Sequence, residues 1–60
     1  MNEIDDTIGT AAYLGMPAET LKQWRHLGKG PAYFKAGKHV RYRRSAVDAW
    51  ADSQTVTPAA

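Results

Sequence analysis

The chemically active side chains of this chain are concentrated in one positively charged segment. All eight lysines and arginines lie between Lys22 and Arg44, and none of the six aspartates and glutamates lies there. Both histidines, His26 and His39, fall within the same segment. Eight cations without an interspersed acid repel one another, so the segment indicates a polyanionic partner, of which nucleic acid is the commonest in a cytoplasm.

Two alternatives to nucleic acid would also account for such a segment. The first alternative is a solvated basic face that keeps a small protein soluble. The second is a segment that binds an anionic membrane surface. Membrane binding needs an amphipathic helix with large apolar side chains opposite a basic side, whereas part of this segment predicts a hairpin. Self-repulsion among the cations argues against a face that serves solubility alone. Nucleic acid is therefore the favoured partner, and no membrane is expected.

The residues that other kinds of chemistry require are missing or isolated. The chain contains no cysteine, which excludes disulfides and cysteine-containing zinc sites. His26 and His39 have no suitably placed carboxylate to complete a metal site. Ser45 and Ser53 lack a recognisable histidine base, and there is no Gly-rich phosphate loop. We therefore expect no enzymatic activity, no cofactor and no metal.

The length of 60 residues limits the chain to one domain of modest stability. No run approaches the roughly 18 apolar residues that span a membrane. The acidic start, residues 1–6, lacks the basic and apolar parts of a signal peptide. These features predict a protein of the cytoplasm.

Two short helices joined by a tight turn are predicted in the first half of the chain. The first runs from an N-cap at Thr7 to about Leu14, and the second from about Pro17 to Leu27. The residues available for packing in the first are Ile8, Ala11, Ala12 and Leu14. A period of 3.6 gathers one side of the second from Thr20, Leu21, Trp24 and Leu27. The opposite, polar side consists of Glu19, Lys22, Gln23 and His26, with Arg25 on the flank.

A β-hairpin is predicted around Gly37-Lys38-His39. A two-residue turn would pair Val40 with Lys35 and mix apolar and charged side chains on both faces. A three-residue loop pairs Ala36 with Val40 and Phe34 with Tyr42, so we favour that register. It separates an apolar face (Phe34, Ala36, Val40 and Tyr42) from a polar face (Tyr33, Lys35, Arg41 and Arg43).

A short last helix is predicted from a capping-box pattern, Ser45 to Asp48, with Val47 and Trp50 packing inward. Residues 1–6 are expected to be frayed, residues 7–52 to form the domain, and residues 53–60 to be a disordered tail.

In this order of elements the chain resembles the excisionase-type winged-helix family. The resemblance covers about residues 7–51 and is carried by Thr10–Trp24 and by Gly28–Trp50. Its recurring features are the Trp of the second helix, the Gly-Pro loop, the glycine of the hairpin and the Tyr-Arg-Arg run. The chain is also similar to the DNA-binding part of mercury-resistance-type regulators, without their long dimerising helix. Gly9 and Met16 depart from the pattern, and they weaken only the expectation for the first helix.

The resemblance implies a fold of the α+β class, a small winged helix-turn-helix with two helices, a two-stranded hairpin wing and a short C-terminal helix. Family members bind repeats of double-stranded DNA beside an attachment site, often cooperatively, bend the DNA and turn a phage integrase toward excision. The implied partners are double-stranded DNA, the integrase and further copies on DNA, at the nucleoid of a bacterial host. Some members regulate transcription instead, so a small repressor is the alternative. An adaptor for an acidic protein surface is a third hypothesis.

The candidate DNA-binding residues form two groups. The recognition-helix group consists of Glu19, Thr20, Lys22, Gln23, Arg25 and His26, although periodicity places Thr20 on the apolar side. Gln, Lys and Glu side chains can pair with adenine, guanine and cytosine edges, whereas Arg25 suits a phosphate. The wing and its flank contribute Lys35, Lys38, His39, Arg41, Arg43 and Arg44, which suit phosphate or minor-groove contacts.

Overall fold

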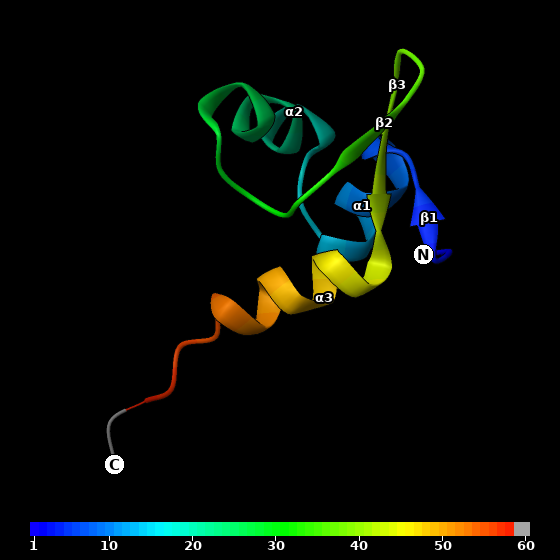
Figure 1. The fold of residues 1–60 in the computed structure, drawn as a ribbon. Helices are drawn as coiled ribbons and strands as arrows, with labels where there is room; N and C mark the ends of the chain where they lie inside the picture. The colour runs from blue at the N-terminus through cyan, green and yellow to red at the C-terminus, as the bar shows by residue number, and fades with distance from the viewer. Residues whose placement is uncertain (59–60) are drawn as a thin grey trace.

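The computed structural model describes residues 1–58 of the chain. It contains three helices and a three-stranded antiparallel sheet, the α+β architecture of a small winged helix-turn-helix. The elements in chain order are β1 (Ile4–Asp5), α1 (Thr7–Leu14), α2 (Ala18–Leu27), β2 (Phe34–Ala36), β3 (His39–Arg43) and α3 (Arg44–Ser53). In Figure 1, α2 and the tip of the β2–β3 hairpin lie at the end of the molecule opposite α3.

The two helices of the helix-turn-helix end in the same way. Gly15 after α1 and Gly28 after α2 have φ values of 70° and 71°. The residue after each glycine donates its N–H back into the helix, from Met16 to Ala11 O (3.0 Å) and from Lys29 to Trp24 O (2.9 Å). This is the Schellman termination, which favours glycine because other side chains are strained at positive φ. The predicted end of each helix is therefore confirmed.

The start of α1 differs from the prediction by one residue. Asp6, not Thr7, is the N-cap, and its carboxylate accepts a hydrogen bond from the Gly9 N–H at 2.8 Å. Gly9, where the excisionase pattern has an acidic helix former, lies directly under the Asp5 carboxylate. A Cβ at this position would collide with that carboxylate. The glycine therefore makes room for the strand that precedes the helix.

The N-terminal segment is not frayed at residues 4–5, contrary to the sequence-based expectation. Ile4 pairs with Arg43 and Asp5 with Tyr42, which makes β1 an edge strand of the sheet β1-β3-β2. The Arg44 N–H also donates to Glu3 O at 2.7 Å. A strand of two residues carries almost no sequence pattern, and its partner lies 37 or more residues away along the chain.

The hairpin has the register of the two-residue turn, not the predicted three-residue loop. Lys35 pairs with Val40 and Ala36 with His39, so the turn has two residues, Gly37 and Lys38. Gly37 has φ 65°, the positive value that a type II′ turn requires at its first central position. The three-residue loop and its pairing of Ala36 with Val40 are wrong. Opposite residues of an antiparallel pair share a face, so Val40 and Tyr42 lie on the same face as Lys35, and Arg41 and Arg43 on that of Phe34.

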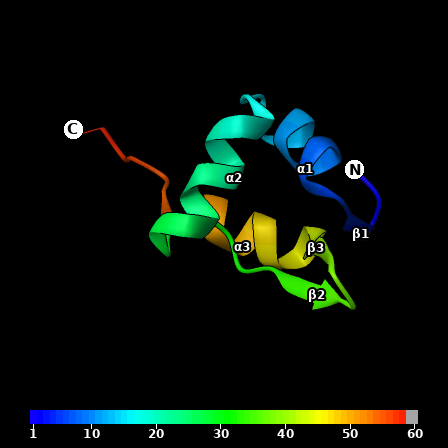
Figure 2. The ribbon, with the colours of Figure 1, turned by 90° about the horizontal axis from the view of Figure 1, so that it is seen from above.

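The register differs from the prediction because other elements cover only part of this face of the hairpin. Helices α1 and α2 lie on one side of the hairpin (Figure 2), and Tyr42 is completely buried there, while Val40 is half-buried. Lys35 shares that face but stays exposed near the turn. A charged side chain costs nothing on a face that water still reaches, so separating polar from apolar residues is no guide to the register there.

The core is small and is drawn from every large element. Ala11, Leu21, Tyr42 and Val47 are its buried apolar residues, and Trp24 and Val40 pack against it from partly buried positions. Ile8 and Leu27, both predicted to pack inward, are 72% and 62% exposed. Each lies at one end of its helix, beyond the region that the neighbouring elements cover.

The last helix begins without the predicted capping box. Arg43 is at the N-cap position and makes no side-chain cap hydrogen bond. Val47 is buried and Trp50 half-buried, as predicted. Ser53 belongs to α3, residues 55–58 form no helix or strand, and the remainder of the predicted tail, residues 59–60, lies outside the described residues.

Candidate nucleic-acid interface

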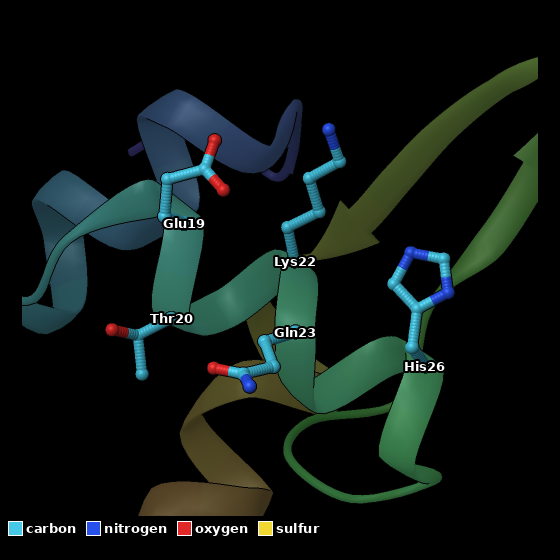
Figure 3. A pocket seen from close by; sticks show the side chains of 5 residues that line it. All are labelled: Glu19, Thr20, Lys22, Gln23 and His26. Carbon is cyan, nitrogen blue, oxygen red and sulfur yellow. The ribbon is translucent and has the colours of Figure 1, made fainter.

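The polar side of α2 is exposed, in the phase that its periodicity predicts. Figure 3 shows Glu19, Lys22 and His26 pointing the same way from the helix, with Thr20 and Gln23 on an adjacent row. These five side chains line one open hollow on the surface. All are exposed except Thr20, which is half-buried. A helix with one uncovered polar row can enter a major groove, which is about 12 Å wide.

The phase of α2 is held from the side that faces the protein. Leu21 is 1% exposed, and Trp24 packs on Trp50 of α3 with ring centroids 5.5 Å apart. Lys22 and Gln23 follow Leu21 directly, so burial of Leu21 turns both outward. The rigid scaffold behind the helix therefore determines which residues it presents.

The tip of the hairpin carries exposed basic side chains. Lys38 occupies the turn, and Lys35 and His39 lie beside it, all three exposed. Figure 1 places this tip at the same end of the molecule as α2. One surface of the protein therefore combines a polar helix face with a basic turn.

The remaining wing cations are divided by the observed register. Arg41 is half-buried, and its Nη1 donates to its own neighbour Val40 O at 2.8 Å. Arg43 lies over the Phe34 ring, with Cζ 5.0 Å from the centroid. Arg44 opens α3 and lies near Glu3 of the N-terminal segment. Arg41 and Arg43 therefore do not share a face with Lys35, contrary to the predicted polar face.

The charges of the basic segment are almost entirely uncompensated. Within residues 1–58 the one salt bridge joins Arg44 Nε to Glu3 Oε2 at 4.0 Å, and both side chains are about half exposed. Such a surface pair contributes little. The other cations of the described chain have no carboxylate within that distance, so their positive potential is available to a polyanion.

Arg25 is placed differently from its neighbours on α2. It is half-buried, and its Nη1 donates to Thr7 Oγ1 at 2.9 Å and to Tyr42 Oη at 3.2 Å. Its Cζ lies 5.9 Å from the centroid of the Tyr33 ring. A phosphate contact was the predicted role of Arg25, and none of these three partners was predicted. No sequence signal links residues 7, 33 and 42, because the fold alone brings them together.

A second polar contact that the sequence did not predict joins α1 to α3. The Tyr13 hydroxyl donates to Asp48 Oδ1 at 2.7 Å. This hydrogen bond to the carboxylate raises the pKa of Tyr13, because ionising the phenol would remove the donor and place a second negative charge beside Asp48. Asp48, which was expected to cap α3, serves instead as an acceptor between the two helices.

Residues 1–58 contain neither a cluster of potential metal ligands nor a helix that could span a membrane. No three side chains of His, Asp or Glu gather there to hold an ion. None of the helices described is both long and apolar enough to cross a bilayer.

The architecture and the exposed face together define a small helix-turn-helix protein with a basic wing. Residues 10–55 match the family model of the helix-turn-helix domain, and the chain belongs to that family. No curated protein matches the chain. The helix-turn-helix domain is a DNA-binding module, so the family supports DNA as the partner and a binding role in place of an enzymatic one.

Proposed function

We propose that this protein is an excisionase-type DNA-binding protein, which binds repeats at an attachment site and directs a phage integrase toward excision. The observation that carries the proposal is the shared surface of α2 and the hairpin tip. An exposed polar helix row and an uncompensated basic turn lie at the same end of the molecule. The resemblance of residues 7–51 to the excisionase-type pattern points from DNA binding in general to recombination.

In this proposal α2 lies in the major groove. Gln23 pairs bidentately with an adenine, Lys22 donates to a guanine, and Glu19 accepts from a cytosine amino group. His26 lies on the same exposed row as Lys22, and Thr20 borders it. The side chains are exposed and are held by a helix whose opposite side is packed, so they need little reorganisation to meet base edges.

The wing contributes affinity more than sequence preference. Lys35, Lys38 and His39 at the tip meet the phosphates or the minor groove beside the helix. The positive field is extended along β3 by Arg41 and Arg43 and into α3 by Arg44. If about six cations neutralise phosphates, the logarithm of the association constant falls with the logarithm of salt concentration at a slope near −5. A slope near zero would remove DNA from consideration.

The excision role is tested in a purified recombination reaction. An attachment-site substrate is incubated with the phage integrase that recombines it, with and without the protein. The expected result is excision that depends on the protein and is lost with Lys22→Ala. Footprinting on the same substrate should show protected repeats that fill cooperatively.

Excision at equal rates in both reactions would overturn the recombination role. If the chain then protected a promoter and reduced transcription from it, a small repressor that uses the same surface would replace the proposal. In cells, a fluorescent fusion of the excisionase should lie over the bacterial nucleoid.

A further inference from the structure

The side chain of Arg25 directly connects α2 and β3, two elements that otherwise are linked mainly through α1. Helix α2 packs on α1, and β3 packs on α1 and α3. Arg25 extends from α2 to Thr7 at the start of α1 and to Tyr42 near the end of β3. It therefore joins the polar helix directly to the strand that carries the wing.

The acceptor on the wing is held in place. Tyr42 is 0% exposed, so its ring cannot change orientation without disturbing the core. The rings of Tyr33 and Tyr42 lie 6.0 Å apart at 52°, and the Arg25 guanidinium lies over Tyr33. The guanidinium is thus held by two hydroxyls, which both accept from its Nη1, and by one aromatic face.

Recognition by two separate elements requires a defined angle between them. A base-reading helix and a phosphate-binding wing gain affinity together only if both reach the duplex in one pose, and loss of that pose lowers affinity without removing any contact group. The orientation of the wing also needs a side chain to fix it, because strands β2 and β3 extend beyond the covered part of the sheet.

We propose that Arg25 is a positioning residue, which acts through the Tyr42 and Thr7 hydroxyls to hold the wing at the angle that DNA recognition requires. It does so in place of the phosphate contact that the sequence suggests. The inference rests on DNA binding by α2 and the wing, and it is independent of the excision role.

The test compares Tyr42→Phe with Arg25→Gln in the full chain. Tyr42→Phe keeps the buried ring and every charge and deletes the hydroxyl alone. Affinity is measured for a duplex enriched by the wild-type chain from a random-sequence pool, and for the unselected pool. Tyr42→Phe is expected to weaken the enriched duplex about tenfold, the value of one hydrogen bond to a charged group, and to leave the unselected pool within about twofold.

The salt dependence distinguishes positioning from phosphate binding. Arg25→Gln should weaken the enriched duplex as much as Tyr42→Phe does, with an unchanged salt slope, and the double variant should be no worse than either single variant. Lys38→Gln is the matched control, since it also removes one cation and should reduce the slope by about 0.9. A loss of about 0.9 in the slope for Arg25→Gln, with wild-type affinity for Tyr42→Phe, would overturn the proposal.

Stability is followed by circular dichroism, and affinities are compared where all variants are folded. A merely structural role would lower the melting temperature and leave the affinity of the folded protein unchanged, which also overturns the proposal. If Arg25→Gln does not fold, Thr7→Val and Tyr42→Phe carry the test, and wild-type affinity in both refutes it. Failure of the wild-type chain to bind either duplex would refute the proposed function itself.

Discussion

The indole rings of Trp24 in α2 and Trp50 in α3 pack with their centroids 5.5 Å apart and their planes tilted by 54°. Both side chains are half-buried, and the Lys29 Nζ lies 5.8 Å from the Trp24 ring centroid on the solvent side. This pair joins the candidate DNA-reading helix to the helix at the opposite end of the molecule (Figure 1). The outward direction of Lys22 and Gln23 depends on it.

Trp24→Ala should therefore lower the free energy of unfolding by about 3 kcal/mol, the lower end of the range for truncating a packed tryptophan. A domain of 60 residues has about 0.1 kcal/mol of stability per residue, roughly 6 kcal/mol in all, so the variant should lose about half of its stability and melt at a much lower temperature. Thermal melts followed by far-ultraviolet circular dichroism measure the effect. Leu27→Ala on the same helix is the control and should change stability by less than about 0.5 kcal/mol, because Leu27 is 62% exposed. Equal losses in the two variants would contradict the assigned phase of α2.

Thr10→Val should stabilise the protein. Thr10 is 0% exposed, and its Oγ1 has no hydrogen-bond partner among the described residues. Valine has nearly the same shape and removes the cost of burying an unpaired hydroxyl, so we expect a gain of about 1 kcal/mol and a melting temperature about 5 °C higher. Thr10→Ser keeps the hydroxyl and loses the methyl group, so it should be destabilised. A Thr10→Val variant less stable than the parent would show that the hydroxyl has a partner.

The positive φ of Gly37 in the two-residue turn predicts that a D-residue is tolerated there better than an L-residue. A Cβ on Gly37 meets no atom within 4 Å, so space is not what the glycine provides. Its φ of 65° is strained for an L-residue, and Gly37→Ala should cost about 1 kcal/mol. A synthetic chain with D-alanine at position 37 should keep parental stability or exceed it, because a D-residue adopts positive φ without strain. Equal destabilisation by L-alanine and D-alanine would contradict the positive φ of position 37.

Tyr13 should confer a pH dependence at alkaline pH. Its pKa in the folded protein is raised by the hydrogen bond to Asp48, so the neutral phenol is favoured by folding. The stabilisation is complete below the unfolded pKa of about 10 and is lost as the pH rises through the higher folded value. Melting temperatures should therefore fall more steeply above about pH 10 for the wild type than for Tyr13→Phe. Parallel pH profiles for the two proteins would refute a role for this pair in stability.

Substitutions on the two parts of the proposed DNA surface should have different effects. Lys22→Ala or Gln23→Ala should change which bases are preferred by about 1–3 kcal/mol at the contacted positions and leave the melting temperature unchanged. Lys38→Ala should weaken all duplexes about equally, since a phosphate contact carries no sequence information. Selection from a random-sequence pool followed by sequencing measures both effects. A sequence-selective loss for Lys38→Ala would contradict its assignment to the wing.

Several features follow from the order of residues alone. Glycines at positions 15 and 28 end both helices where predicted, because the positive φ there is a local requirement. The period of α2 separates buried Leu21 from exposed Lys22 and Gln23, since an eleven-residue window contains about three turns of helix. The concentration of cations between Lys22 and Arg44 needs no structure to be seen.

Only the tertiary structure decided what depends on distant segments. Strand β1 exists because β3 offers it an edge, and Gly9 is explained only once Asp5 lies over it. The hairpin register follows from how much of the sheet face the helices cover, which separates buried Tyr42 from exposed Lys35 on one face. The contacts of Arg25 with Thr7, Tyr33 and Tyr42 cross 8 to 18 positions of sequence. Local preferences act over a few residues, whereas these contacts form only when the whole chain has packed.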